Sequence, residues 1–237
     1  MENPFSKVEC ITFSSCILDN RITNFNKWFP RVQTLEFYDN RGECIEHNFP
    51  NLEKLVISST KCQIANISRA LTLNPQLKYF HSYNQLDANF LQEFSENLQN
   101  IQDLCIDFSS KPIDTSIIHL KNVQRLSITC FQPMLKLPFA FGSVQKCHLK
   151  VIDSPDWNDV IRFINRHPTL TEFSITSSAE GADKTELFQA LSKIETVEFR
   201  IHQFSIDDVI ACTKAEKCLD KEWSLSIEGG QYVKLTR

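Results

Sequence analysis

The sequence predicts an α/β solenoid, in which tandem units each add one strand to a curved parallel sheet on the concave face and place mixed helices and turns on the convex face. A six-residue pattern, with apolar residues at its first, fourth and sixth positions, occurs nine times. Repetition at a short, nearly constant spacing indicates units that stack on one another. The copies begin 20 to 26 residues apart, at Val8, Val32, Leu52, Leu77, Ile101, Val123, Val144, Leu170 and Ile194.

The pattern also predicts which side chains form the core. Successive side chains of a strand point to opposite faces, so the fourth and sixth positions supply one inner face, while the first packs where the chain enters the strand. One unit cannot bury this face alone, whereas stacked units share a continuous core. Only the fourth copy departs from the pattern, with Ser82 in the last apolar slot. Trp28 and Trp157 stand beside apolar residues, and we expect both in the core.

The segments between the strands are expected to be partly helical. Ser154 followed by Pro155 predicts an N-cap and a first helical position. The intervals around Pro133 and Pro138 are too short for long helices and should hold turns or extended chain. Proline also stands two residues before the first apolar position of four copies, where it can end a helix before the strand begins. Apolar residues recur at helical spacing over 64–71, 90–98, 157–164 and 187–191.

The two ends of the predicted solenoid differ. Residues 1–218 are assigned to about nine repeats, and residues 219–237 are predicted to form two strands around Gly229 and Gly230, a hairpin that caps the C-terminal end. The first repeat begins close to Met1, without a polar segment to cover it. Because an uncovered edge strand invites association, we expect the native protein to continue toward the N-terminus or to cover this edge with a partner.

Composition and motifs argue against several classes of function. Lys and Arg total 25 against 29 Asp and Glu, so the chain lacks the basic excess on which non-specific nucleic-acid binding depends. Motifs of nucleotide-binding proteins, zinc proteases and serine hydrolases are absent, and no two of the six histidines have helical ligand spacing. We therefore expect no enzyme activity, no cofactor, no metal and no small-molecule substrate.

The cysteines and the absence of long apolar runs predict the compartment. The nine cysteines include no Cys-x-x-Cys pair, and the first residues lack the basic and apolar stretches of a secretory signal. No apolar run approaches the roughly 18 to 20 residues needed to span a bilayer. The sequence thus predicts reduced thiols and a cytoplasmic or nuclear protein that does not enter a membrane.

The tandem pattern resembles the leucine-rich repeat family, whose signature L-x-x-L-x-L-x-x-N/C-x-L returns about every 20 to 29 residues. The resemblance covers about residues 5–201, and Cys16 and Asn40 fill the Asn/Cys slot of the first two repeats. The uneven repeats, the Phe-Pro-x-Leu lead-ins and the W-x-L-x-I tail are similar to the repeat portion of F-box and leucine-rich-repeat proteins, although no F-box is recognisable. That resemblance implies repeats that select the substrate of a ubiquitin ligase.

The strand positions that alternate with the buried ones line the concave face and supply candidate binding residues. In the fourth to seventh repeats they bring aromatic, acidic and basic side chains into one patch of about 15 to 20 Å, because neighbouring strands lie about 4.8 Å apart. Exposed Tyr and Arg often carry the binding energy of protein interfaces. The predicted partner-binding residues are Tyr79, His81, Tyr83, Asp103, Asp107, Arg125, Lys146 and Lys150.

These observations predict a non-enzymatic scaffold that binds a protein partner on its concave face, and the resemblance implies a ubiquitin-ligase substrate or adaptor as that partner. Any solvated sheet face carries polar residues, so a structural repeat protein that associates through its N-terminal edge is the alternative. A nucleic-acid phosphate track through Arg125, Lys146 and Lys150 is a weaker alternative. A convergent Cys/His or paired-carboxylate site would indicate an enzyme instead.

Overall fold

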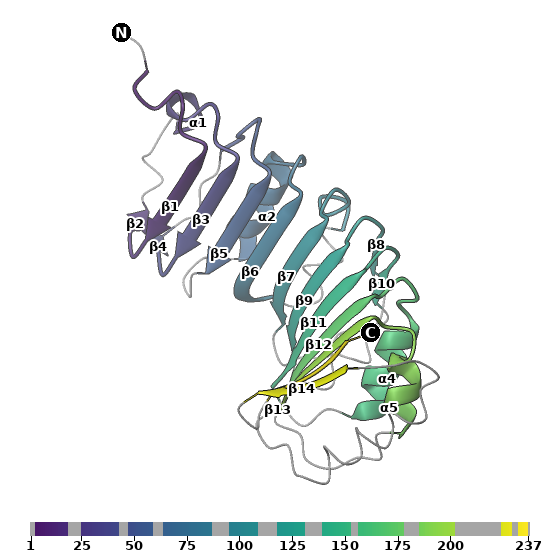
Figure 1. Cartoon of the computed structure of the whole chain (residues 1–237). Coiled ribbons are helices and arrows are strands. Elements are labelled where there is room, and N and C mark those ends of the chain that lie inside the picture. Colours follow the sequence, from purple (N-terminus) through teal and green to yellow (C-terminus); the bar gives the residue numbers. More distant parts are fainter. Residues whose placement is uncertain are drawn as a thin grey trace.

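The computed structural model is an α/β fold built on one open sheet (Figure 1). It describes residues 3–18, 25–42, 47–58, 64–86, 95–108, 118–130, 139–152, 156–177, 185–201, 224–228 and 232–236. Nine parallel strands lie side by side in chain order. They are β1 (Cys10–Ser14), β3 (Thr34–Tyr38), β5 (Lys54–Ser58), β6 (Tyr79–Leu86), β7 (Asp103–Phe108), β9 (Arg125–Cys130), β11 (Lys146–Val151), β12 (Glu172–Ser177) and β13 (Thr196–Ile201).

The register of this sheet follows the repeat in the sequence. Cys10 pairs with Thr34, Thr34 pairs with Lys54, and the same position continues across every parallel pair to Thr196. The steps along this ladder are 24, 20, 25, 24, 22, 21, 26 and 24 residues, which are the spacings of the apolar pattern. The predicted open parallel sheet is therefore confirmed strand by strand.

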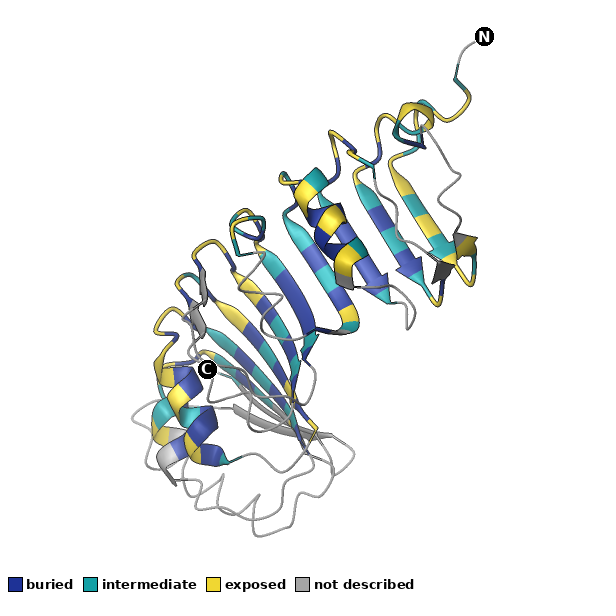
Figure 2. Cartoon of the chain, turned by 180° about the vertical axis from the view of Figure 1, so that it is seen from behind, coloured by how far each residue is buried: buried dark blue, intermediate teal, exposed yellow. Residues whose placement is uncertain are grey.

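The core lies along the inner face of the sheet and is thicker than predicted. In every repeat after the first, the described side chains at the first, fourth and sixth positions are buried (Figure 2). Two further rows are buried with them. One row lies three residues before the pattern and comprises Phe49, Asn74, Leu98, Leu120, Phe141, His167 and Leu191. The other lies beyond its end and comprises Leu86, Phe108, Cys130, Val151 and Ser177.

A tight turn leads into most of the strands. In the third repeat the N–H of Leu52 donates to the carbonyl of Phe49 at 3.0 Å, and the same bond recurs at Ile101 and Ile194. Proline suits the second position of such a turn, because its ring fixes φ near −65°. Pro50 occupies that position, so the lead-in prolines shape the turn before the strand.

Asparagine amides tie neighbouring repeats together at two levels. Asn74 is buried, accepts from the N–H of Phe49 at 2.8 Å and donates to the carbonyls of His47 and Ala70 at 3.1 and 2.8 Å. Asn40, in the slot that the repeat signature gives to Asn or Cys, accepts from the N–H of Cys16 at 2.8 Å. A buried polar group is tolerated only when its hydrogen bonds are made, and both amides meet this condition.

Helices and short strands connect the repeats on one face of the sheet (Figures 1 and 2). They are α1 (Phe25–Trp28), β2 (Ile17–Leu18) with β4 (Arg41–Gly42), α2 (Ile64–Leu73), β8 (Ile118–Leu120) with β10 (Phe139–Phe141), α4 (Trp157–Asn165) and α5 (Thr185–Leu191). This mixture agrees with the predicted helices and extended segments. Within the described part of the chain, every helix is too short or too polar to traverse a membrane.

The cap of helix α4, the helix predicted over 90–98 and the two tryptophans can be compared with the sequence-based predictions. Helix α4 begins at Trp157 with Asp156 as its N-cap, whose carboxylate accepts from the N–H of Asn158 at 2.9 Å, so the predicted cap at Ser154 is wrong. Ser154 itself lies outside the described residues, as does most of the helix predicted over 90–98. Trp157 is buried as expected, whereas Trp28 is 54% exposed.

The C-terminal tail contributes two strands to the sheet. β14 (Ser224–Glu228) and β15 (Tyr232–Thr236) pair with each other in antiparallel fashion, and β15 pairs antiparallel with β13. The tail therefore extends the sheet past β13, its last parallel strand, and β15 runs in the direction opposite to β13. The division into residues 1–218 and 219–237 stays a prediction.

The buried amide of Asn74 should matter for stability. Replacing Asn74 by Ala should lower the free energy of unfolding by at least about 2 kcal/mol, because the Phe49 N–H and two carbonyls lose a buried partner. The matched change Asn122→Ala removes one bond from an exposed amide and should cost less than about 1 kcal/mol. Urea unfolding of both variants measures this difference, and equal losses would contradict it.

Candidate functional site

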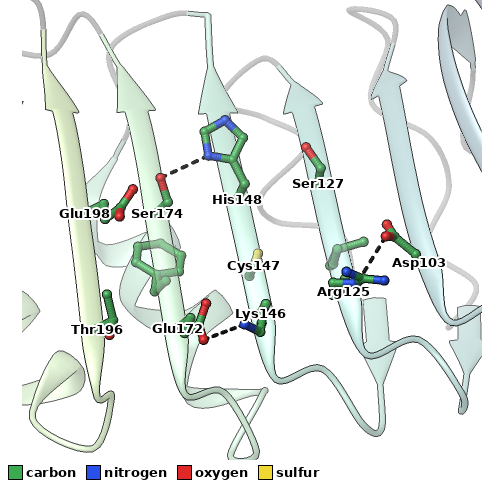
Figure 3. A pocket seen from close by; sticks show the side chains of 12 residues that line it. Asp103, Arg125, Ser127, Lys146, Cys147, His148, Glu172, Ser174, Thr196 and Glu198 are labelled. Carbon is green, nitrogen blue, oxygen red and sulfur yellow. Dashed lines mark hydrogen bonds and ion pairs between the residues drawn. The ribbon is translucent and has the colours of Figure 1, made fainter. Parts of the chain in front are cut away.

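The side chains that alternate with the buried ones form the open face, which lies opposite the helices (Figures 1 and 2). This is the surface predicted as the concave face. A hollow of about 260 Å³ lies on it across β7, β9, β11, β12 and β13. The side chains that matter for its chemistry are Asp103, Arg125, Ser127, Lys146, His148, Glu172 and Glu198 (Figure 3).

Arg125 lies at the centre of a cluster drawn from three strands. Its Nε is 3.1 Å from Oδ2 of Asp103, and its guanidinium carbon is 5.9 Å from the ring centroid of Tyr79. The other oxygen of Asp103 lies 3.1 Å from Nε2 of His81. The structure thus brings four of the predicted site residues together. Tyr79, Asp103 and Arg125 occupy one row of the ladder, and His81 occupies the next row on the same face.

Lys146 lies directly beside Arg125 in the ladder, so two cations are neighbours on the open face. Like charges on opposed positions of adjacent strands are unfavourable unless something compensates them. Here each cation turns away from the other toward a carboxylate: Arg125 pairs with Asp103, and Nζ of Lys146 lies 2.6 Å from Oε1 of Glu172 (Figure 3). The two cations therefore flank the part of the hollow that lies between β9 and β11.

A polar row lies above this pair of cations. Nδ1 of His148 is 3.0 Å from the hydroxyl of Ser174 (Figure 3). Burial lowers the pKa of His148, and the charge of Arg200 lowers it further against the opposing effect of Glu198. The ring is therefore neutral at physiological pH and offers one donor and one acceptor.

The sequence did not single out several residues that line the hollow. Ser127, His148, Glu172, Ser174 and Glu198 all line the hollow, yet none was among the predicted site residues. They stand at the same alternating strand positions as the predicted ones, so the signal was present. Alternation gives the direction of a side chain and not the depth of the surface around it, which is why the hollow itself could not be located.

The strand of Tyr83 is irregular where that residue stands. The β6–β7 ladder shifts between Ser82 and Gln85, so Gln85, and not Tyr83 as the alternation predicts, stands opposite Asp107. The shift lets the apolar Leu86 occupy the buried row after the polar Ser82. Tyr83 is 49% exposed, and its pKa is raised by partial burial and by its hydrogen bond to Cys105, which lies on the open face.

Asp107 and Lys150 complete the predicted set but do not line the hollow. Asp107 is half-buried on β7 and helps to raise the pKa of Tyr83. Lys150 is exposed on β11, and its charge lowers the pKa of His148. The predicted patch is therefore one surface that runs from the tyrosines of β6 to the hollow beyond β7.

The described buried thiols have little nucleophilic character. Burial raises the pKa of Cys105, raises that of Cys130 to about 12 and raises that of Cys147 further. A thiol is reactive as its thiolate, so these three groups remain protonated and inert at neutral pH. Among the described residues, no group of three or more His, Cys, Asp or Glu side chains is placed to hold a metal ion.

Comparison with protein-family models gives no match to this chain. Comparison with curated protein sequences gives no significant match either. The class that the structure defines is an α/β chain with an open sheet of nine parallel strands, which β15 and β14 extend; its described helices lie on one face and its hollow on the other.

The environment of His148 makes its titration a test of the site. A nuclear magnetic resonance titration should place its pKa below the ordinary 6.5, and Arg200→Ala should raise it by removing a nearby positive charge. Between the folded and unfolded pKa values the unfolded chain binds more protons, so this group makes the fold less stable as the pH falls below about 6.5. A midpoint at or above 6.5 would contradict the described burial.

Proposed function

We propose that this chain is a leucine-rich-repeat solenoid that binds a protein partner through its open face, without enzymatic chemistry. Its ladder steps of 20 to 26 residues fall within the range of that repeat family. Parallel sheets are normally covered on both faces, whereas the helices in the described part of this chain all lie on one face. A long sheet with one face in solvent suits a solenoid that offers that face to a partner.

The observation that carries the proposal is the pair of neighbouring cations, one of which lies against the half-buried ring of Tyr79. Arg125 and Lys146 both line the hollow and are held apart by their ion pairs with Asp103 and Glu172. A partner carboxylate placed between them would meet two cations that are already oriented, so little side-chain entropy is lost on binding. Tyr83, further along the same strand as Tyr79, adds exposed aromatic surface, which is typical of residues that anchor protein partners.

The same geometry favours a protein over nucleic acid. A phosphate track needs several cations whose charge is available to the backbone. Arg125 and Lys146 are each paired with a carboxylate on a chain of net charge −4, which weakens the attraction of a polyanion. A partner segment with one carboxylate among apolar and polar side chains fits the arrangement better.

The resemblance to F-box and leucine-rich-repeat proteins adds a more specific proposal, in which the partner is a substrate or an adaptor of a ubiquitin ligase. Affinity capture of the tagged chain from cells tests it by mass spectrometry. Adaptor subunits of a ubiquitin ligase among the specifically enriched proteins are the expected result. Their absence, with other partners retained, would remove the ligase proposal and leave the binding proposal intact.

The open face should control partner recovery. A variant with Tyr79→Ala, Tyr83→Ala and Arg125→Ala should reduce capture of the specific partners at least about tenfold, since central Tyr and Arg residues each contribute about 2 kcal/mol or more at many interfaces. Circular dichroism and urea unfolding first establish that the variant is folded.

The control carries three exposed substitutions outside the open face, Lys121→Ala, Gln124→Ala and Lys193→Ala. It should recover the same partners as the unmodified chain. Unchanged recovery of the partners with the tyrosine and arginine variant would contradict the open-face proposal. Equal losses of partners with both variants would show a general effect of changing the surface.

A further inference from the structure

The first strand, β1, presents an unpaired backbone edge among the described residues. It lies at the end of the sheet, with β3 as its only neighbour there. The carbonyl of Glu9 accepts from β3 residues, and the N–H of Ser15 donates to the carbonyl of Tyr38 at 2.8 Å. Because backbone groups alternate in direction along a strand, those of Cys10, Thr12 and Ser14 face away from β3.

The side chains at this end of the sheet are less covered than elsewhere. Val8, Ile11 and Phe13 hold the apolar positions of the first repeat, yet they are only partly buried. Ile17, in the adjoining β2, is 81% exposed, and Trp28 is 54% exposed. The core of the first repeat is thus incomplete within the described chain.

The described residues of this edge carry few of the features that natural sheets use to prevent pairing. Such features are charged side chains, proline, bulges and covering loops. Residues 8–16 contain no Lys, Arg or Pro, and Glu9 is their only charged residue. Within β1 itself no side chain is charged, so two copies of this strand would not repel each other.

We propose that β1 binds a second copy of this chain, with the two strands antiparallel about Thr12. Thr12 then faces Thr12 of the second copy, and Cys10 faces Ser14, so the outward backbone groups of both strands meet as hydrogen-bonded pairs. On the inner face Ile11 meets Phe13 of the second copy, and the two partly exposed cores become continuous. The arrangement is a closed two-fold dimer, in which one surface is its own complement.

Other alignments of the two strands fit less well. After a slip by one residue, the outward-facing backbone groups of one copy stand opposite residues of the second copy whose backbone groups already bond to β3. The inner side chains of one copy then also stand opposite side chains that point to the open face of the second copy. A slip by two residues restores the backbone pairing, but in one direction it places Glu9 opposite Phe13. In the other direction it places Ile11 opposite Ser15, whose φ of 54° departs from strand geometry. The alignment about Thr12 is the one that joins backbone groups and apolar side chains together.

Sedimentation equilibrium of the purified chain should give about twice the 27.4 kDa monomer mass at concentrations of tens of micromolar. Thr12→Pro removes an outward N–H and should yield a folded monomer, because proline is tolerated on the free side of an edge strand. It should unfold cooperatively in urea, at a lower concentration than the dimer, whose association stabilises the folded chain. A monomeric unmodified chain, or a dimer that survives Thr12→Pro, would overturn the proposal.

Disulfide cross-linking tests the same alignment without introducing a proline into β1. Thr12→Cys should form a disulfide-linked dimer on mild oxidation, because hydrogen-bonded antiparallel partners have Cα atoms about 5.5 Å apart, within the range of a disulfide. The matched change Thr176→Cys, on the open face of an interior strand, should cross-link no more than the unmodified chain. Equal cross-linking of the two variants would contradict the alignment.

This inference is independent of the partner proposed for the open face. The Thr12 variants leave the tyrosines and Arg125 in place, so they should still capture the open-face partners. Loss of dimerisation with retained capture, or the reverse, separates the two proposals.

Discussion

Two backbone N–H groups at the start of each strand donate to one carbonyl of the preceding repeat. Gln33 and Thr34 share the carbonyl of Glu9, at 2.8 and 3.0 Å, and the same arrangement recurs seven more times, up to Glu195 and Thr196. This interaction sets the register of each repeat against the one before it. The stacking of buried rows and the alignment of the open face both depend on it, because a shift of one residue would turn every side chain to the other face.

The chemistry of the open face is a consequence of that alignment. Asp103, Arg125, Lys146 and Glu172 belong to four different repeats, yet the ladder places them in a single row. Their charges run acid, base, base, acid, so each base has its own acid and the two bases remain neighbours. No single repeat contains this arrangement, which exists only once the strands are paired.

The sequence predicted what its spacing encodes. The period of the apolar residues gave the strands, their order and the direction of each side chain, which brought Tyr79, Asp103 and Arg125 into one patch. It also marked Ser82 as irregular without showing that the ladder would shift there. Trp28 was misplaced: around the short helix α1, Phe25 is buried and packs against Phe29, whereas Trp28 stands in solvent. The hollow depends on how Lys146 and Arg125 turn, which alternation alone does not determine.

The constant spacing of the ladder has a consequence for how the chain folds. Each parallel pair joins residues only 20 to 26 positions apart, so the loop-closure entropy of adding a strand is nearly the same at every step. Contacts remain local however many repeats follow, which favours fast growth from any pair of strands that forms first. The reversed strand β15 ends this series, because it pairs with β13 by a different geometry and must wait for that strand to be in place.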